Sequence, residues 1–504
     1  MSNRIILIPL DSRPPNTRMP EQLAALGGFE LILPPMELLG DLRRSADRPR
    51  LRKWLDKHLG RGALVVSADM LAYGGLVASR KPDTSPEEAL MGLLPLREIK
   101  ARFPEMKVYA FNVILRDAGT VTDAESFAKW QNEMKGAAEK GSPLRTRNFE
   151  INRKMIRWAG EGVFDFLILG KEDTAEGNPY GDEIKKLRAY AGKSGGGRVS
   201  VQTGADELSM LLVARHIAGT ISPEPSVYID AAGAAVGSIV PKYEPEPYGK
   251  TLEFQIKSAG GKVVKKADGA DAVIVPYIAK KQEDWFLDQV NGTVTTDPAP
   301  PAKLTAAVAK HVAAGRAVGF ADALHANGSS PALVGALADE GLLFGLAAYA
   351  GWNTAANTSG TVIAQTIVAE VALRRKPRGV FPMNLYRGTA LLNLLLERVV
   401  NDCLYAAQVR GELAVATDSP MALPDPAKTE HDLRFKITTK FRSFLWRRLR
   451  DKRIKVFGET LQDYAFTESG VIRDAYFPWG RLFEAVIEPW AGIKTMNAGE
   501  EGDE

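Results

Sequence analysis

Acidic side chains stand directly after several short apolar runs in this chain, and the best pair among them is Glu172 and Asp173. Two adjacent carboxyl groups repel one another, so we expect the pKa of one of them to rise towards the range of a proton donor. Hydrolysis of a glycosidic bond needs one carboxyl group as proton donor and a second as base, nucleophile or stabiliser. The pair therefore indicates carbohydrate chemistry, with Asp69 and Asp206 as alternative partners.

Other polar residues follow the apolar runs in the same way, and we expect them to bind the substrate. They are Asp11, Ser12, Arg13, Asn16, Asp69, Tyr73, Asn112, Arg116 and Glu207. Arg13 and Arg116 suit an anionic or hydroxylated part of a substrate, and a phosphate if the sugar is phosphorylated. Tyr73 and Tyr180 can also stack on the face of a sugar ring.

The stretch "AYAGWNTAANTSGTVIAQ" adds a third group of candidate substrate-binding residues, namely Trp352, Asn353, Thr354 and Asn357. An apolar run leads here into an aromatic residue and amides at the start of a helical pattern. Such a helix start suits an oxyanion or sugar hydroxyl groups, and Trp352 can stack on a sugar. The nearby "FADALHANGSS", with Asp322, His325 and Asn327, shows a weaker form of the same pattern.

Each of these residues also has a structural interpretation. Asp206 and Glu207 can open a helix, where acids offset the helix dipole, and Asp11 before two prolines can form a turn. The Asn and Thr residues after Trp352 can cap a helix, and the arginines can pair with neighbouring carboxylates. The functional interpretation is favoured because polar residues recur at the same end of successive predicted strands.

The elements that must position these residues alternate between strands and helices. Short apolar runs predict strands at 5–10, 29–33, 63–67, 108–113, 164–169 and 199–202, and then at 227–230, 262–265, 272–276, 317–321 and 346–349. Amphipathic stretches between the first six predict helices at 21–26, 50–59, 86–103, 124–141 and 151–160. This alternation predicts parallel strands joined by right-handed crossovers, whose carboxyl ends gather ligand-binding residues.

We therefore predict an α/β protein, beginning with a (β/α) barrel-like or large parallel-sheet domain. The proline-rich stretches "SPEPSVYID" and "VPKYEPEPYGK" indicate a boundary near residue 221. The expected organisation is a catalytic domain at 1–221, a second, smaller α/β domain at 222–375, a mostly helical region at 376–496 and a disordered acidic tail at 497–504.

Composition and motifs exclude several other classes of protein. A net charge of +4 over 504 residues argues against a nucleic-acid binder. The single cysteine, Cys403, permits no internal disulfide, and the five histidines form no HExxH pair. A Walker A sequence and a GxGxxG after a strand are absent, and no GxSxG stands between a strand and a helix as an elbow would. The chain enters its first strand by about residue 4 and has no apolar run of membrane-spanning length, so we expect a cytoplasmic protein without a membrane partner.

The leading hypothesis is a cytoplasmic hydrolase, a glycosidase that acts on a small amino-sugar or sugar-phosphate glycoside. No cofactor is expected, the partner is a small carbohydrate, and homo-oligomerisation is left open. A first alternative is a metal-assisted hydrolase or lyase with a divalent cation on Asp11, Asp69 and Asp206. A second is a non-catalytic sugar-binding or regulatory protein whose basic 430–455 segment contacts a partner, although that segment also fits an amphipathic helix packed on its own fold.

Five long motifs in order resemble the uncharacterised bacterial family named domain of unknown function 4127. They are "PLDSRPPN", "SADMLAYGGLVASR", "LILGKEDTAEGNPYGDE", "GADELSMLLVAR" and "YAGWNTAANTSGT". The resemblance covers residues from about 4 to 400 and implies no secure activity. The family pattern has two aspartates where this chain has Glu172 and Asp173, which makes Asp173 the stronger candidate for the acid/base, with Glu172 or Asp206 as second carboxyl group. It also has an acid where Ser329 and Ser330 stand here, which weakens a role for that loop.

Overall fold

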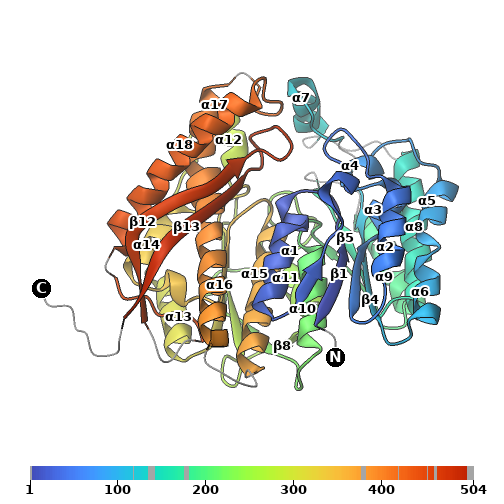
Figure 1. Ribbon diagram of the computed structural model, residues 1–504, viewed down its shortest axis with the longest axis horizontal. Coiled ribbons are helices and arrows are strands. Elements are labelled where there is room, and N and C mark those ends of the chain that lie inside the picture. The colour runs from blue at the N-terminus through green and yellow to red at the C-terminus, as the bar shows by residue number, and fades with distance from the viewer. Residues whose placement is uncertain are drawn as a thin grey trace, which may run out of the picture. The chain divides into compact units, whose positions relative to one another are not determined.

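The computed structural model describes residues 3–116, 119–133, 142–174, 181–375, 382–417, 419–450, 452–458 and 463–496. The chain divides into two compact units (Figure 1). Unit 1 comprises Met1–Ser222 and Val240–Gly260, and unit 2 comprises Pro223–Ile239 and Gly261–Glu504. The segment 240–260, expected in the second domain, thus clusters with unit 1. The expected acidic tail at 497–504 lies outside the described residues.

Unit 1 is built on a six-stranded parallel sheet with the order β2-β1-β3-β4-β5-β6. Its strands are β1 (Arg4–Ile8), β2 (Glu30–Ile32), β3 (Ala63–Ser67), β4 (Lys107–Ile114), β5 (Phe166–Lys171) and β6 (Val199–Thr203). The predicted large parallel sheet is confirmed. Within the described ranges it is an open sheet with edges at β2 and β6, and it does not close into a barrel.

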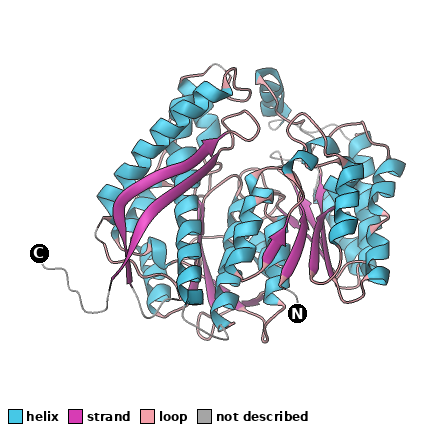
Figure 2. Cartoon of the chain, in the orientation of Figure 1, coloured by secondary structure: helices cyan, strands magenta, loops and turns pink. Residues whose placement is uncertain are grey.

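Helices cover both faces of this sheet (Figure 2). The helical elements of unit 1 are η1 (Pro14–Asn16), α1 (Arg18–Leu26), η2 (Met36–Leu38), α2 (Arg48–His58), α3 (Ala68–Tyr73), α4 (Leu76–Ser79), α5 (Pro86–Leu93), α6 (Leu96–Arg102), α7 (Ala124–Glu133), α8 (Pro143–Gly160), α9 (Gly181–Ser194), α10 (Leu208–Ala218) and α11 (Tyr248–Ser258). The strand order reverses beside β1, because β2 lies on one side of it and β3 on the other. Open α/β sheets bind ligands at such a switch point, outside the carboxyl ends of the strands.

The helix predicted over 151–160 begins eight residues earlier, at Pro143, as α8, and two other predicted helices of unit 1 also differ from the structure. The helix predicted over 86–103 is divided into α5 and α6, with Leu94 and Pro95 between them. Proline lacks the amide hydrogen that a continuing helix needs, so the break falls where the sequence places Pro95. The helix predicted over 124–141 ends at Glu133 as α7, and residues 134–141 lie outside the described part of the chain.

Unit 2 contains a five-stranded parallel sheet with the order β11-β10-β9-β7-β8. Its strands are β7 (Ser226–Ile229), β8 (Lys262–Val264), β9 (Ala272–Ile278), β10 (Ala317–Ala323) and β11 (Ala348–Ala350). Counted from β8, the five strands follow the same doubly wound order as β2-β1-β3-β4-β5 of unit 1. The two units therefore share one topology, although the sequence shows no repeat of fixed period.

The helices of unit 2 are α12 (Trp285–Asn291), α13 (Ala302–Ala313), α14 (Pro331–Asp339), η3 (Leu343–Gly345), α15 (Ala355–Arg374), α16 (Pro382–Arg398), η4 (Val399–Val409), α17 (Arg410–Val415), α18 (Pro426–Phe444) and η5 (Leu445–Leu449). The central helix α15 packs on β9, β10 and β11. It is buried on all sides from Ala355 to Ala372. The element η4 is a π-helix, a rare form that often occurs at functional sites.

The C-terminal region was expected to be mostly helical, but it ends in an antiparallel hairpin of β12 (Asp463–Tyr476) and β13 (Val486–Met496). The strands are joined by a long connection without the Asn-Gly or Asp-Gly turn that marks a hairpin in a sequence. The basic segment lies largely on α18, which packs against β12 through Leu433, Ile437 and Phe441. This four-residue spacing is typical of an amphipathic helix packed on its own fold, which is the structural interpretation given above for the basic segment.

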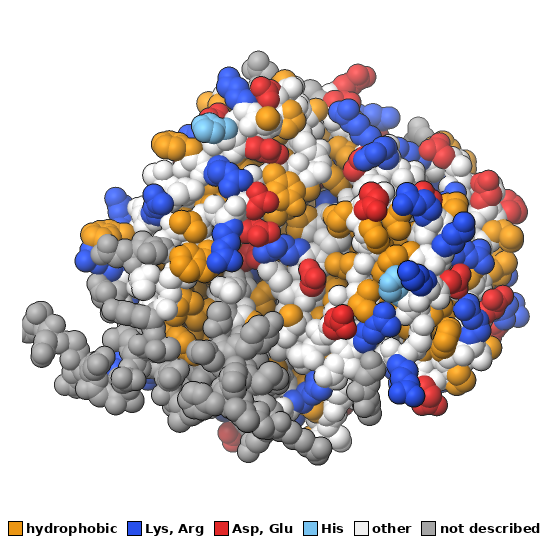
Figure 3. Space-filling view, in the orientation of Figure 1, with side chains coloured by type: hydrophobic (Ala, Val, Ile, Leu, Met, Phe, Trp, Pro, Cys, Tyr) orange, Lys and Arg blue, Asp and Glu red, His pale blue; other side chains and the backbone are white. Residues whose placement is uncertain are grey.

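The face of the molecule seen in Figure 3 carries basic and acidic side chains interspersed with apolar ones. Among the described residues, no helix is long and apolar enough to cross a membrane.

Candidate functional site

The loops that follow β1 and β6 meet in a polar cluster of Asp11, Arg13, Asn16 and Asp206, which we call the arginine clamp. Arg13 donates to Asp11 Oδ2 from Nε at 3.0 Å and from Nη2 at 2.6 Å. The same guanidinium donates to both oxygens of Asp206, from Nη1 at 3.1 Å and from Nη2 at 2.6 Å. Asn16 Nδ2 lies 3.1 Å from Asp11 Oδ1 and 3.3 Å from Asp206 Oδ1. The clamp therefore joins two loops that are far apart in the sequence.

The local sequence explains how the first of these loops is shaped. Pro14 stands at the first position of the short helix η1, where its fixed φ is favourable and its missing N–H costs nothing. The backbone N–H of Arg13 donates to Asp11 Oδ1 at 2.9 Å, and that of Asn16 donates to the Arg13 carbonyl at 3.0 Å. The prolines and these turns hold Asp11, Arg13 and Asn16 in one orientation.

The clamp is almost closed to solvent, because none of its four residues is more than 6% exposed. Burial raises the pKa of Asp206, and the charge of Asp11 adds to the rise, while Arg13 opposes it. Asp206 therefore holds a proton more readily than an ordinary aspartate does.

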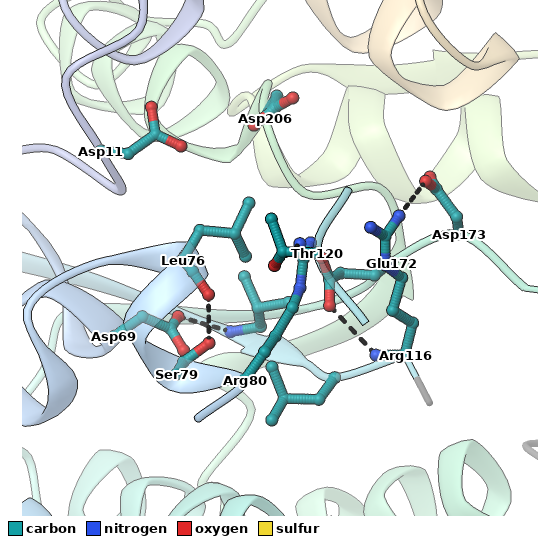
Figure 4. Close-up of polar contacts among 12 residues, drawn as sticks. Asp11, Asp69, Leu76, Ser79, Arg80, Arg116, Thr120, Glu172, Asp173 and Asp206 are labelled. Carbon is teal, nitrogen blue, oxygen red and sulfur yellow. Dashed lines mark hydrogen bonds and ion pairs between the residues drawn. The ribbon is translucent and has the colours of Figure 1, made fainter. Parts of the chain in front are cut away.

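A second cluster lies at the ends of β4 and β5 and centres on Glu172, which pairs with the guanidinium of Arg80 (Figure 4). Its other oxygen accepts a hydrogen bond from the backbone N–H of Arg116 at 3.0 Å. Burial by itself would raise the pKa of Glu172, but the charges of Arg80 and Arg116 outweigh it and lower the pKa to about 2. Glu172 is thus ionised, and the raised pKa expected from repulsion between adjacent acids does not fall on this residue.

Asp173 is the exposed member of the pair. Its carboxylate accepts from Arg116 Nη1 at 2.9 Å, and its side chain is 30% exposed, against 4% for Glu172. Arg116 therefore contacts both acids, one through its backbone and one through its side chain. Arg80, which the candidate set omitted, also donates to Thr120 Oγ1 at 3.0 Å. The sequence feature that could have identified Arg80 is its position at the end of "SADMLAYGGLVASR", the stretch that follows a predicted strand.

Asp69 and Asn112 lie behind the second cluster and are completely buried. Asp69 Oδ2 accepts from the backbone N–H of Val113 at 2.9 Å. Burial raises the pKa of Asp69 to about 8, and the negative charge of Glu172 adds to the effect. These two residues, expected to bind substrate, lie in the interior behind the cluster.

Three more candidates have different surroundings. Glu207 is fully buried and accepts from Ala205 N at 3.0 Å and from Gln255 Nε2 at 3.1 Å. Tyr73 is also buried, with the Arg147 guanidinium 4.4 Å from its ring centre. Ser12 is partly exposed beside the clamp. Of the three, Ser12 alone is open to a ligand. Tyr180, considered for stacking, lies outside the described residues.

The residues of the metal alternative do not come together in a metal site. Asp11 and Asp206 both bind the cation of Arg13, whereas Asp69 binds a backbone N–H of β4. In the described ranges, no group of three or more His, Cys, Asp or Glu residues is arranged to hold a metal ion.

The candidates Trp352, Asn353, Thr354 and Asn357 belong to unit 2, and the carboxylates described above belong to unit 1. Thr354 is the N-cap of α15 and accepts from the backbone N–H of Asn357. Trp352 Nε1 donates to Thr361 Oγ1 at 3.2 Å. The segment is therefore the capped helix start given above as its structural interpretation, with Asn353 in the left-handed region at φ 52°.

Unit 2 has its own buried acids at the carboxyl ends of its strands. Asp322 Oδ2 accepts from Ser330 N at 2.8 Å and from the Tyr349 hydroxyl at 2.9 Å, and burial raises its pKa to about 6. Asp402, on the π-helix η4, accepts from Gly351 N at 3.1 Å, and burial raises its pKa as well. Asp402 was missed because a lone acid in an apolar helical stretch carries no local signal of its strand partners.

These features define an α/β protein with two doubly wound parallel sheets and buried networks of carboxylates and arginines at the carboxyl ends of the strands in unit 1. The model of the family described as "Protein of unknown function (DUF4127)" matches residues 5–140 and 138–488, and the chain belongs to this family. The resemblance found in its motifs is thereby confirmed. No curated protein matches the chain.

Proposed function

We propose that the protein is a carbohydrate-active hydrolase, a glycosidase that acts on a small amino-sugar or sugar-phosphate glycoside. The observation that carries the proposal is the contrast between Asp173, whose carboxylate reaches solvent, and the buried charges that hold it in place. An exposed carboxylate at the carboxyl edge of a parallel sheet, next to a rigid arginine, is suited to proton transfer on a bound substrate.

In this proposal Asp173 is the acid/base, and Arg116 binds a hydroxyl group or phosphate of the substrate. Glu172 is a positioning residue that acts through Arg116 and Arg80, since its own carboxylate is buried between them. Asp206 is the second carboxyl group, held in one orientation by Arg13 and Asn16 of the clamp.

A sugar-binding protein without turnover is the second candidate. This candidate is favoured because the buried acids Asp11, Asp206 and Glu172 are all engaged in ion pairs with arginines. Such saturated networks rigidify a binding site but leave few free groups for chemistry.

Turnover of nitrophenyl glycosides, plain and 6-phosphorylated, with and without chelator, tests the first proposal. We expect hydrolysis of at least one substrate that survives the chelator. Saturable binding of the sugars with no turnover would support the binding protein, and turnover abolished by chelator would contradict both candidates.

A further inference from the structure

Three buried asparagines form a chain of side-chain amides that ends at Asp69. Asn148 and Asn152 lie one turn apart on α8, and Asn112 lies on β4. The amides of Asn148 and Asn152 are joined at 3.1 Å, and those of Asn152 and Asn112 at 2.8 Å. The far end of the Asn112 amide lies 2.9 and 3.2 Å from the two carboxyl oxygens of Asp69.

The backbone fixes the direction of the first amide. The N–H of Leu115 points at one end of the Asn148 amide at 3.2 Å, and the carbonyl of Val113 faces the other end at 2.8 Å. A backbone N–H can only donate and a carbonyl can only accept. Asn148 must therefore present Oδ1 to Leu115 and Nδ2 to Val113.

This orientation passes along the chain. Because Asn148 presents Oδ1 to its neighbour, Asn152 must face it with Nδ2 and turn its own Oδ1 towards Asn112. Asn112 must then donate from Nδ2 to that oxygen, which leaves Asn112 Oδ1 facing the carboxyl group of Asp69. An ionised Asp69 has only acceptors, so two sets of oxygens would meet without a proton between them.

Turning Asn112 around would satisfy an ionised Asp69 but would move the conflict along the chain. Two oxygens would then meet between Asn112 and Asn152. Reversing Asn152 and Asn148 as well would set the Asn148 NH₂ against the N–H of Leu115 and its oxygen against the carbonyl of Val113. Each such buried mismatch leaves polar groups unsatisfied, which is unfavourable in the interior of a protein.

We propose that Asp69 is a neutral carboxylic acid at neutral pH and donates its proton to Asn112 Oδ1. It is a positioning residue that ties the start of α3 to β4 without placing a second negative charge beside Glu172. The inference does not depend on the activity proposed above.

The surroundings of Asp69 agree with this assignment. Its side chain is fully buried, and burial together with the negative charge of Glu172, on the loop after β5, raises its pKa to about 8. Arg80 after α4 acts in the opposite direction, but it is paired with Glu172. On α3, Tyr73 faces the same interior and is covered by Arg147 from α8.

The test compares the full chain with Asp69→Asn. At pH 6, unfolding converts the neutral acid into an ionised one, so we expect the wild type to release about one more proton than the variant. Calorimetric unfolding in buffers of different ionisation enthalpy counts these protons. The matched control is Asp165→Asn. Asp165 also accepts from a backbone N–H of β4, that of Val108 at 2.7 Å, but Lys100 and Lys107 help to keep its pKa low. The control should release as many protons as the wild type.

An infrared difference spectrum of the folded proteins at pH 7 gives a second readout. The wild type minus Asp69→Asn should show the carbonyl stretch of a protonated carboxyl group, shifted in heavy water, and the wild type minus Asp165→Asn should lack it. If Asp69→Asn does not fold, the band is followed in the wild type, where it should persist at pH 7 and disappear as the pH rises past about 8. Equal proton release by wild type and Asp69→Asn, or absence of the band, would overturn the proposal.

Discussion

The guanidinium of Arg13 donates two hydrogen bonds to the carboxylate of Asp206, across 193 positions of the chain. Three strands separate β1 from β6 in the sheet, so this ion pair joins loops that the sheet itself does not bring together. Both side chains are buried. The pair therefore acts as a cross-link over the carboxyl edge of unit 1, where the topology places its ligand site.

Arg13→Gln is expected to destabilise unit 1 by about 3–5 kcal/mol, because it leaves the buried carboxylates of Asp11 and Asp206 without their cation. Urea unfolding at pH 7 measures this effect. The matched control is Arg44→Gln, which removes an exposed pair with Asp41 and should cost less than about 1 kcal/mol. Equal, small losses in both variants would show that the clamp does not hold the loops together.

Glu172 makes the free energy of unfolding depend on pH in the acid range. Its pKa is lowered to about 2 in the folded chain, below its ordinary value of 4.5, so its contribution is complete above about pH 4.5 and is lost as the pH falls towards 2. The linked free energy is about 3 kcal/mol, and Glu172→Gln should remove this part of the pH dependence. Unfolding followed between pH 2 and 6 tests it, with the surface variant Glu161→Gln as control. An unchanged acid dependence in Glu172→Gln would contradict the assignment.

Much of the fold was predictable because parallel strands buried on both faces appear as continuous apolar runs, and all eleven strands of the two sheets were located this way. The order of strands was not predictable, since a closed barrel and an open sheet have the same alternation along the chain. The β12–β13 hairpin was missed because its long connection carries no turn signal.

The candidate site was predicted as a set of residue types at strand ends, but not as a set of contacts. Whether Glu172 is neutral or ionised depends on Arg80, which lies 92 positions away. The assignment of Trp352 and its neighbours to a different unit from the carboxylates likewise depends on how the chain folds, and no local pattern records it.

Tyr349→Phe is expected to destabilise unit 2 more at pH 8 than at pH 5. The Tyr349 hydroxyl donates to Asp322, whose pKa is raised to about 6, so the hydrogen bond has a charged acceptor only above that pH. We expect a loss of about 1.5–3 kcal/mol at pH 8 and less at pH 5, by denaturant unfolding. The control is Tyr405→Phe, because that buried hydroxyl donates to the neutral carbonyl of Leu482 and its loss should not vary with pH. A pH-independent loss in Tyr349→Phe would rule out the charged acceptor.

The central claim, that Asp173 is the acid/base of a carbohydrate hydrolase, is tested most directly by turnover of nitrophenyl glycosides by wild type, Asp173→Asn and Asp56→Asn. Asp56 is the matched control because it is also an exposed aspartate paired with an arginine, Arg102, at 3.0 Å. General acid/base catalysis contributes roughly 10²–10⁴-fold, so Asp173→Asn should lose activity by that factor while Asp56→Asn keeps it. Retention of full turnover by a folded Asp173→Asn protein would contradict the account.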